Sequence, residues 1–118
     1  MLDQLRRHAF HVLQEVELTG AGTVEFLVMG PTGVFTIATC RRFDGALVAA
    51  VKRQATTLQE VLDVAVTPVI CPPGRQGRPP FEHADVWVVR RDDLVSWLRS
   101  QQNEVLEFVR FPRLADRL

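Results

Sequence analysis

The chain has little of what would place it in several common classes of protein. It contains two cysteines, Cys40 and Cys71, which are too few for a disulfide framework or for a zinc site with four cysteine ligands. It has no apolar run long enough to cross a bilayer, and its N-terminal stretch MLDQLRRHAF lacks the apolar segment of a signal peptide. We therefore expect a cytoplasmic protein that does not interact with a membrane.

Neither sign of charge is in excess. Fourteen Lys and Arg residues balance fourteen Asp and Glu residues, and Lys52 is the single lysine. A chain of zero net charge has no global attraction for nucleic acid or for an anionic membrane, so such binding would need a local group of arginines. Because 47% of its residues are hydrophobic, the chain should fold as one domain over residues 1–118.

The spacing of apolar residues predicts an α/β domain with a mixed sheet. We expect a short helix, a meander of three antiparallel strands, a helix, two further strands and a C-terminal helical region. In chain order, the predicted ranges are 2–7, 10–18, 24–29, 34–40, 46–64, 67–71, 85–90 and 92–110. The segment 72–85, which is rich in proline and glycine, is predicted to be a loop.

Individual positions sharpen this prediction. On the first strand, Val12, Val16 and Leu18 are expected on one face. Asp92 is the expected N-cap of the last helix. Because a crossover helix joins them, strand 67–71 should lie parallel to a strand of the meander. The central helix has an apolar stripe that should pack on the sheet, formed by Val51, Ala55, Leu58 and Leu62.

The run VEFLVMGPTGVFTIATCRRFDG, residues 24–45, resembles the central motif of the nuclease-related domain (NERD). That family belongs to the restriction-endonuclease-like superfamily, which has a PD-(D/E)XK active site. The Gly-Pro-Thr-Gly turn at 30–33, the strand after it and Gly45 all match the family pattern. The similarity continues through residues 53–62, 66–74 and 86–98. Two departures are a shortened first helix and the lack of the hairpin that usually follows the last glycine.

The resemblance implies a metal-dependent nuclease site, in which an acid and a lysine stand two residues apart on one strand. Here Ala38 and Cys40 occupy those positions, while Glu25 and Gln54 match the other site positions. Alanine cannot ligate a cation, and cysteine is a soft ligand poorly suited to Mg²⁺. The sequence therefore predicts a pseudoenzyme with no metal cofactor, in which Glu25 is a satisfied structural acid.

Two catalytic alternatives remain open from the sequence. In the first, Glu25 holds Mg²⁺ together with relocated partners, Asp44 or Lys52. However, Lys52 and Gln54 lie on opposite flanks of the predicted helix, so Lys52 should point away from the cleft. In the second, Cys40 acts as a nucleophile. No histidine is spaced to pair with it, so a small buried apolar residue is the better interpretation of Cys40.

Binding is the remaining class of function. Strand ends and the predicted loop could together form a phosphate-binding rim for DNA from Arg41, Arg42, Arg75, Arg78, Arg90 and Arg91. Trp87 and Trp97 stand at apolar positions and are expected in the core rather than stacked on bases. The shortened first helix leaves sheet surface that a second copy could cover, which predicts a homodimer. An unidentified protein partner is the other option.

Overall fold

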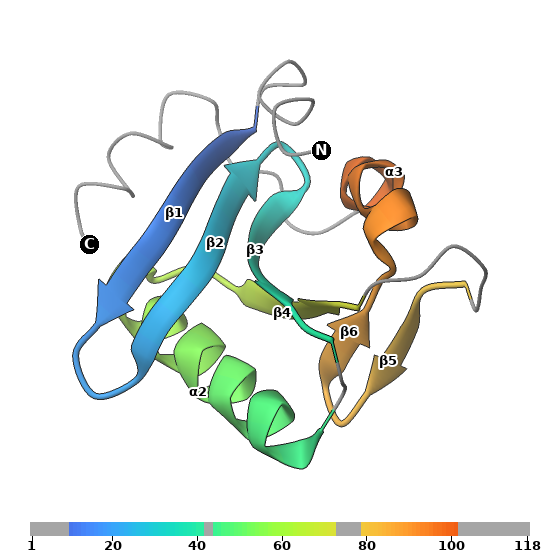
Figure 1. Cartoon of the computed structure of the whole chain (residues 1–118). Helices are drawn as coiled ribbons and strands as arrows, with labels where there is room; N and C mark the ends of the chain where they lie inside the picture. Colours follow the sequence, from blue (N-terminus) through green and yellow to red (C-terminus); the bar gives the residue numbers. More distant parts are fainter. Residues whose placement is uncertain (1–9, 42–43, 73–78, 102–118) are drawn as a thin grey trace.

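The computed structural model describes residues 10–41, 44–72 and 79–101, and Figure 1 shows how its strands and helices are arranged. Six strands form one mixed sheet with helices α2 (Gly45–Leu62) and α3 (Leu94–Ser100), and the 3-10 turn η1 (Arg91–Asp93) leads into α3. The strands are β1 (His11–Leu18), β2 (Gly22–Gly30), β3 (Gly33–Thr39), β4 (Val66–Cys71), β5 (Phe81–His83) and β6 (Val86–Val88).

The strand order across the sheet is β1-β2-β3-β4-β6-β5. The first three strands form the predicted antiparallel meander, and β4 lies parallel to β3 and to β6. The crossover through α2 accounts for the parallel pairing, as the sequence predicted. Within the described residues the meander comes first; the helix expected over 2–7 and the helical stretch expected over 102–110 lie outside them.

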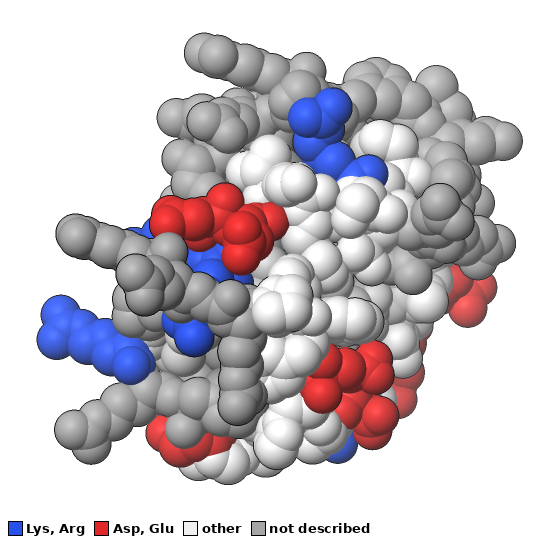
Figure 2. Space-filling view, turned by 90° about the vertical axis from the view of Figure 1, so that its right-hand side faces the viewer, with Lys and Arg blue, Asp and Glu red and all other residues white. Residues whose placement is uncertain are grey.

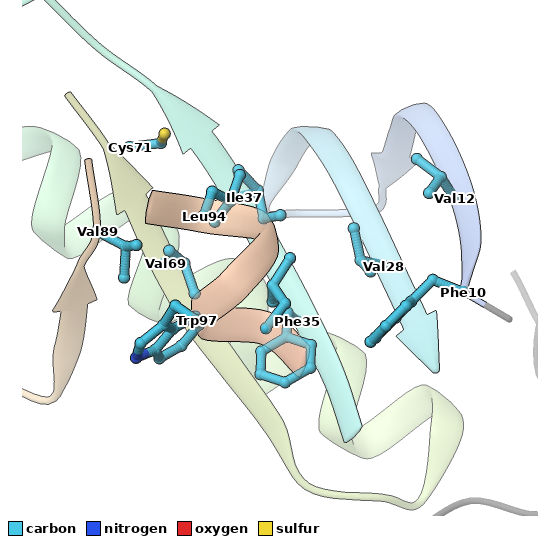
Figure 3. Close-up of a cluster of buried hydrophobic side chains, with 11 residues drawn as sticks. Phe10, Val12, Val28, Phe35, Ile37, Val69, Cys71, Val89, Leu94 and Trp97 are labelled. Atoms are coloured by element: carbon cyan, nitrogen blue, oxygen red, sulfur yellow. The ribbon is translucent and has the colours of Figure 1, made fainter. Parts of the chain in front are cut away.

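The core has a layer on each face of the sheet, and β3 contributes to both. Phe35 and Ile37 belong to the cluster that includes Trp97 of α3, whereas Val34 belongs to the cluster that includes Leu58 of α2. This alternation follows from the two-residue period of a strand. Figure 3 shows the first cluster, where the rings of Phe35 and Trp97 meet edge to face with centroids 5.7 Å apart.

Helix α2 packs its predicted stripe on the sheet. All four residues of the stripe are at most 5% exposed, namely Val51, Ala55, Leu58 and Leu62. The helix begins after Asp44, whose side chain accepts a hydrogen bond from the Leu47 N–H at 2.8 Å. It ends at Asp63, which adopts the left-handed conformation with φ 57°.

The glycine turn between β2 and β3 is fixed by packing as well as by backbone conformation. A Cβ added at Gly30 would collide with the ring of Phe10, so only glycine fits beneath that ring. Thr32 donates a hydrogen bond from Oγ1 to the Leu98 carbonyl at 2.6 Å, which ties this turn to α3. The turn therefore positions α3 on its face of the sheet.

The prediction that Val12, Val16 and Leu18 share one face of β1 is wrong. Val12 packs in the cluster under α3, whereas Val16 and Leu18 pack against the cluster under α2. Glu15, which lies between them, has φ 52° and interrupts the extended backbone. One residue in this conformation breaks the strict alternation of side chains, and the apolar pattern alone did not reveal it.

The loop predicted over 72–85 contains strand β5, which pairs antiparallel with β6 through His83↔Val86. A two-residue turn joins the two strands, with φ 50° at Ala84 and 67° at Asp85. Positive φ at both central residues is the signature of a type I′ hairpin turn, which favours Asn-Gly or Asp-Gly. Ala-Asp does not carry that signature, so the hairpin was missed.

The last strand and helix also differ in their bounds from those predicted. Strand β6 ends at Val88, before the predicted end at residue 90, and Arg90 is the N-cap of the 3-10 turn. The N-cap of α3 is Asp93 rather than Asp92, and its side chain makes no capping hydrogen bond. Both aspartates stand in the first turn of η1, which uses i→i+3 bonding to enter the helix.

Candidate functional site

The two positions at which the predicted nuclease resemblance expects an acid and a lysine, Ala38 and Cys40, lie at the end of β3 and face α2. Ala38 and Cys40 share one face, as predicted, and both pack against a cluster of buried apolar side chains. That cluster joins α2, β4 and β6 through Val48, Val51, Ile70 and Val86. The surface on which a catalytic acid and lysine would act is therefore an apolar contact between β3 and α2.

Glu25 is bound by the residue between those two positions. The ladder between β2 and β3 ends at Phe26↔Ile37, and beyond it the Glu25 side chain reaches Thr39. Its Oε2 accepts the Thr39 N–H at 2.9 Å, and its Oε1 accepts the Thr39 hydroxyl at 2.6 Å. The carboxylate thus replaces the missing strand partner of Thr39, which confirms that Glu25 is a satisfied structural acid.

Sequence reasoning did not identify Thr39 as this partner. As the middle residue of the triplet Ala38-Thr39-Cys40, it was treated as a spacer. A usable signal was available, because a β-branched hydroxyl residue at the end of a strand can satisfy an acid on the neighbouring strand. The missing information was that β2 and β3 stop pairing before this position.

Gln54 binds the opposite end of the meander, at the turn between β1 and β2. Its Nε2 donates to the carbonyl of Ala21 at 3.3 Å and to that of Thr23 at 3.1 Å, where β1 turns into β2. In the described part of the chain it makes no hydrogen bond to Glu25. The four positions that match the nuclease site therefore do not form one polar group: Gln54 and Glu25 have separate structural roles.

The residues considered as relocated partners also have other roles. Asp44 caps α2. Lys52 lies 3.8 Å from Asp85 in the β5–β6 turn, and this ion pair is exposed, with side chains 44% and 88% accessible. Lys52 and Gln54 thus lie on different flanks of α2, as predicted, but the expected position of Gln54 at the site beside Glu25 is wrong, because Gln54 binds the turn between β1 and β2. Among residues 10–41, 44–72 and 79–101, no group of three or more His, Cys, Asp or Glu side chains is arranged to hold a metal ion.

The thiols are protonated and lie on opposite faces of the sheet. Burial raises the pKa of Cys40, and the charges of Asp44 and Glu25 raise it further. Burial raises the pKa of Cys71 from 9.0 to about 11, and Arg91, which donates a hydrogen bond to this thiol, opposes that shift. A nucleophilic cysteine needs a lowered pKa, so the interpretation of Cys40 as a packed thiol is favoured.

Two of the predicted arginines come together. Arg41 and Arg91 line an open hollow of about 620 Å³ with Thr39 and Cys40, where β3 ends and the chain enters α3. Arg90, the residue before Arg91, is half-buried. Arg42, Arg75 and Arg78 lie outside the described residues. Of the arginines predicted to form a phosphate-binding rim, Arg41 and Arg91 therefore line one hollow, where they follow β3 and β6.

The rest of the described surface carries mixed charge. Figure 2 shows acidic and basic side chains of the β5, β6 and α3 side in small separate groups, with uncharged surface between them. Trp97 is 7% exposed, and its ring centroid lies 5.4 Å from that of half-buried Trp87. Both tryptophans pack with the core as predicted, so neither offers a free ring face for a base.

Comparisons with protein-family models, with curated proteins and with solved structures found no match. The described helices include none with the length and apolar character needed to span a bilayer.

Proposed function

We propose that this chain is a catalytically inactive nuclease-related domain of restriction-endonuclease-like type that acts by binding or assembly. One observation carries the proposal: Ala38 and Cys40 pack against the apolar cluster between β3 and α2. A charged acid and lysine at these two half-buried positions would lie against that apolar cluster. The contact stabilises the fold through burial of apolar surface, and it offers no oxygen ligand to a cation.

The state of Glu25 adds support. Mg²⁺ requires near-octahedral oxygen coordination, which proteins provide with carboxylates, waters and substrate phosphates. Both Glu25 oxygens already accept hydrogen bonds from Thr39. A metal would have to share this carboxylate with Thr39, whose N–H and hydroxyl already occupy part of its acceptor capacity. The role that best fits these contacts is structural: Glu25 of β2 binds Thr39 at the end of β3.

A cleavage assay tests the loss of catalysis. Purified protein is incubated with single-stranded and double-stranded DNA in Mg²⁺ or Mn²⁺, beside a Glu25→Ala variant prepared in the same way. We expect no cutting above that of the variant, because neither protein holds a catalytic metal. Clear cutting by the unmodified chain that is lost in Glu25→Ala would overturn the proposal and restore the metal-dependent alternative.

The binding role has three candidate partners: DNA, a second copy of the chain, or another protein. DNA contact is supported by Arg41 and Arg91, which are exposed at one hollow and suit phosphate oxygens through their planar forks. The zero net charge argues for a local contact rather than a broad electrostatic footprint. A cytoplasmic location is part of the same proposal.

A further inference from the structure

The hollow beside Arg41 and Arg91 lies where a ligand is expected in a sheet of this kind. Strands β3, β4 and β6 are parallel, and Thr39, Cys40 and Arg41 follow or end β3, while Arg91 comes after β6. Open α/β sheets bind ligands outside the carboxyl ends of their parallel strands, because loops and helix starts converge there. The hollow thus combines a suitable position with two cationic side chains.

The two arginines are available to a ligand. Both are exposed, and neither forms an ion pair within the described part of the chain. Arg91 is also held in place, because its guanidinium donates a hydrogen bond to the buried Cys71 thiol. A guanidinium keeps further N–H donors after one such bond, so it can still donate to an oxyanion. Both arginines line the same hollow.

We propose that this hollow binds a single phosphate group, either free phosphate or the monoester end of a small molecule, through Arg41 and Arg91. The inference rests on the proposed function, in which the end of β3 binds rather than cleaves. At Arg41 and Arg91 it replaces DNA, one of the partner options given above, with an isolated, doubly charged phosphate, so preferential binding of a duplex would favour the DNA option instead.

The number of cations at the hollow suits one phosphate. Asp44 and Glu25 act on the thiol of Cys40, which lines the hollow, so the two arginines are balanced by nearby acids rather than joined by further cations. Binding to a polymer grows with the number of phosphates that cations neutralise, and the face in Figure 2 shows basic side chains in separate groups with acidic groups among them. Two arginines in a chain of zero net charge match the charge of one phosphate, and they do not supply the several cations that a duplex would need.

Isothermal titration with inorganic phosphate, a nucleoside monophosphate and a short DNA duplex, at matched ionic strength, tests the inference. We expect phosphate and the monophosphate to bind in the millimolar range or tighter, and the duplex to bind no better per molecule than the monophosphate. Arg41→Ala and Arg91→Ala should each weaken phosphate binding by roughly tenfold, since each removes a charge-assisted pair of hydrogen bonds. Arg53→Ala and Arg99→Ala, exposed arginines away from the hollow, are the matched controls and should bind as the parent does.

Folding is checked separately, because Arg91 also contacts Cys71. Thermal unfolding identifies a destabilised Arg91→Ala protein, and Arg41→Ala, whose residue makes no such contact, keeps the test decisive. Arg41→Lys should recover only part of the affinity, because an ammonium lacks the fork.

Three results would overturn the inference: no heat with phosphate at millimolar concentration, binding that survives both alanine substitutions, or preferential duplex binding with a steep dependence on salt. None of them requires DNA cleavage, so failure here is distinct from failure of the proposed loss of catalysis. Conversely, cutting of DNA that depends on Glu25 would refute that loss while leaving the measured phosphate affinity intact.

Discussion

At the scale of single residues, strand β3 contains two threonines whose hydroxyl groups have opposite effects on stability. Thr39 donates both its N–H and its hydroxyl to Glu25. Thr36, three positions earlier, is 2% exposed, and its hydroxyl has no hydrogen-bond partner. A buried hydroxyl without a partner has lost its water and gained nothing in exchange, so it lowers stability. The same residue type therefore stabilises the strand at one position and weakens it at the other.

This contrast gives a paired prediction. Thr36→Val keeps the β-branched shape and removes the unpaired hydroxyl, so the free energy of unfolding should rise by about 1 kcal/mol. Thr39→Val, the matched control on the same strand, should lower it by about 1–2 kcal/mol because it takes a donor from a carboxylate. Urea denaturation of the three proteins measures both changes. A Thr36→Val protein less stable than its parent would show that the hydroxyl has a partner in solution.

The buried thiol of Cys71 makes stability depend on alkaline pH. Its pKa is raised from 9.0 to about 11 in the folded chain. The sign follows from linkage: below 9.0 both states hold the proton and stability is full, whereas above 9.0 the unfolded state loses the proton first and is thereby stabilised relative to the folded state. Stability should therefore fall between 9.0 and about 11, by roughly 1.4 kcal/mol per pH unit at the steepest.

The composition makes this dependence measurable. The chain has no tyrosine and one lysine, so few other groups titrate in this range. Thermal unfolding of the parent and of Cys71→Ala across the range gives the test, and the variant should show a much flatter slope. Cys40→Ala is the control, since Cys40 is less buried and should contribute less of the slope. Equal slopes in the parent and Cys71→Ala would contradict the prediction.

At the scale of elements, the β5–β6 hairpin shows a local conflict between sequence and conformation. Ala84 occupies the left-handed region at φ 50°, where an L-residue other than asparagine or aspartate costs about 1–2 kcal/mol. The pairing of β5 with β6 and the nearby Lys52–Asp85 ion pair favour the turn despite this cost. The hairpin is thus imposed by its tertiary neighbours rather than by its turn residues.

Ala84→Asn should relieve this strain, because asparagine tolerates the left-handed region. We expect the free energy of unfolding to rise by about 0.5–1 kcal/mol. The control is Ala49→Asn, at an exposed position of α2, where the same change should lower stability by roughly 0.5 kcal/mol. Thermal unfolding of both variants shows whether the effect depends on the turn. Losses of similar size in both variants would mean that Ala84 does not need positive φ.

At the scale of the whole molecule, the open question is assembly. Val61, 39% exposed, is the one large hydrophobic side chain exposed in the described part of the chain. Stable homodimers of small domains usually bury a broad apolar patch, and the described surface has none. Glu15 also bends edge strand β1 and Glu17 is exposed beside it, features that oppose edge-to-edge pairing.

The predicted homodimer must therefore use a polar contact or residues outside the described ranges. Light scattering or sedimentation across a range of concentrations tests it, and the expected result is a mass near twice 13.3 kDa at the higher concentrations. Added salt should shift the balance toward monomer if charged side chains make the contact. A monomer mass at every concentration would remove the homodimer from the proposal.

The sequence by itself determined the meander, the crossover helix with its buried stripe and the parallel pairing of β4 with β3. Each depends on a repeating apolar pattern or on chain connectivity. It also determined that Ala38 and Cys40 share a face and cannot supply an acid and a lysine, because side-chain chemistry and the two-residue strand period are local properties.

Only the tertiary structure decided what those residues do instead. The Thr39 clamp on Glu25 depends on where β2 stops pairing with β3. The reversal of faces at Glu15, the Ala84-Asp85 turn and the presence of Arg41 and Arg91 at one hollow depend on contacts between elements distant in the sequence. The end of pairing and these contacts are set by twist, packing and competition between hydrogen-bond partners over the whole sheet. A local pattern does not encode them.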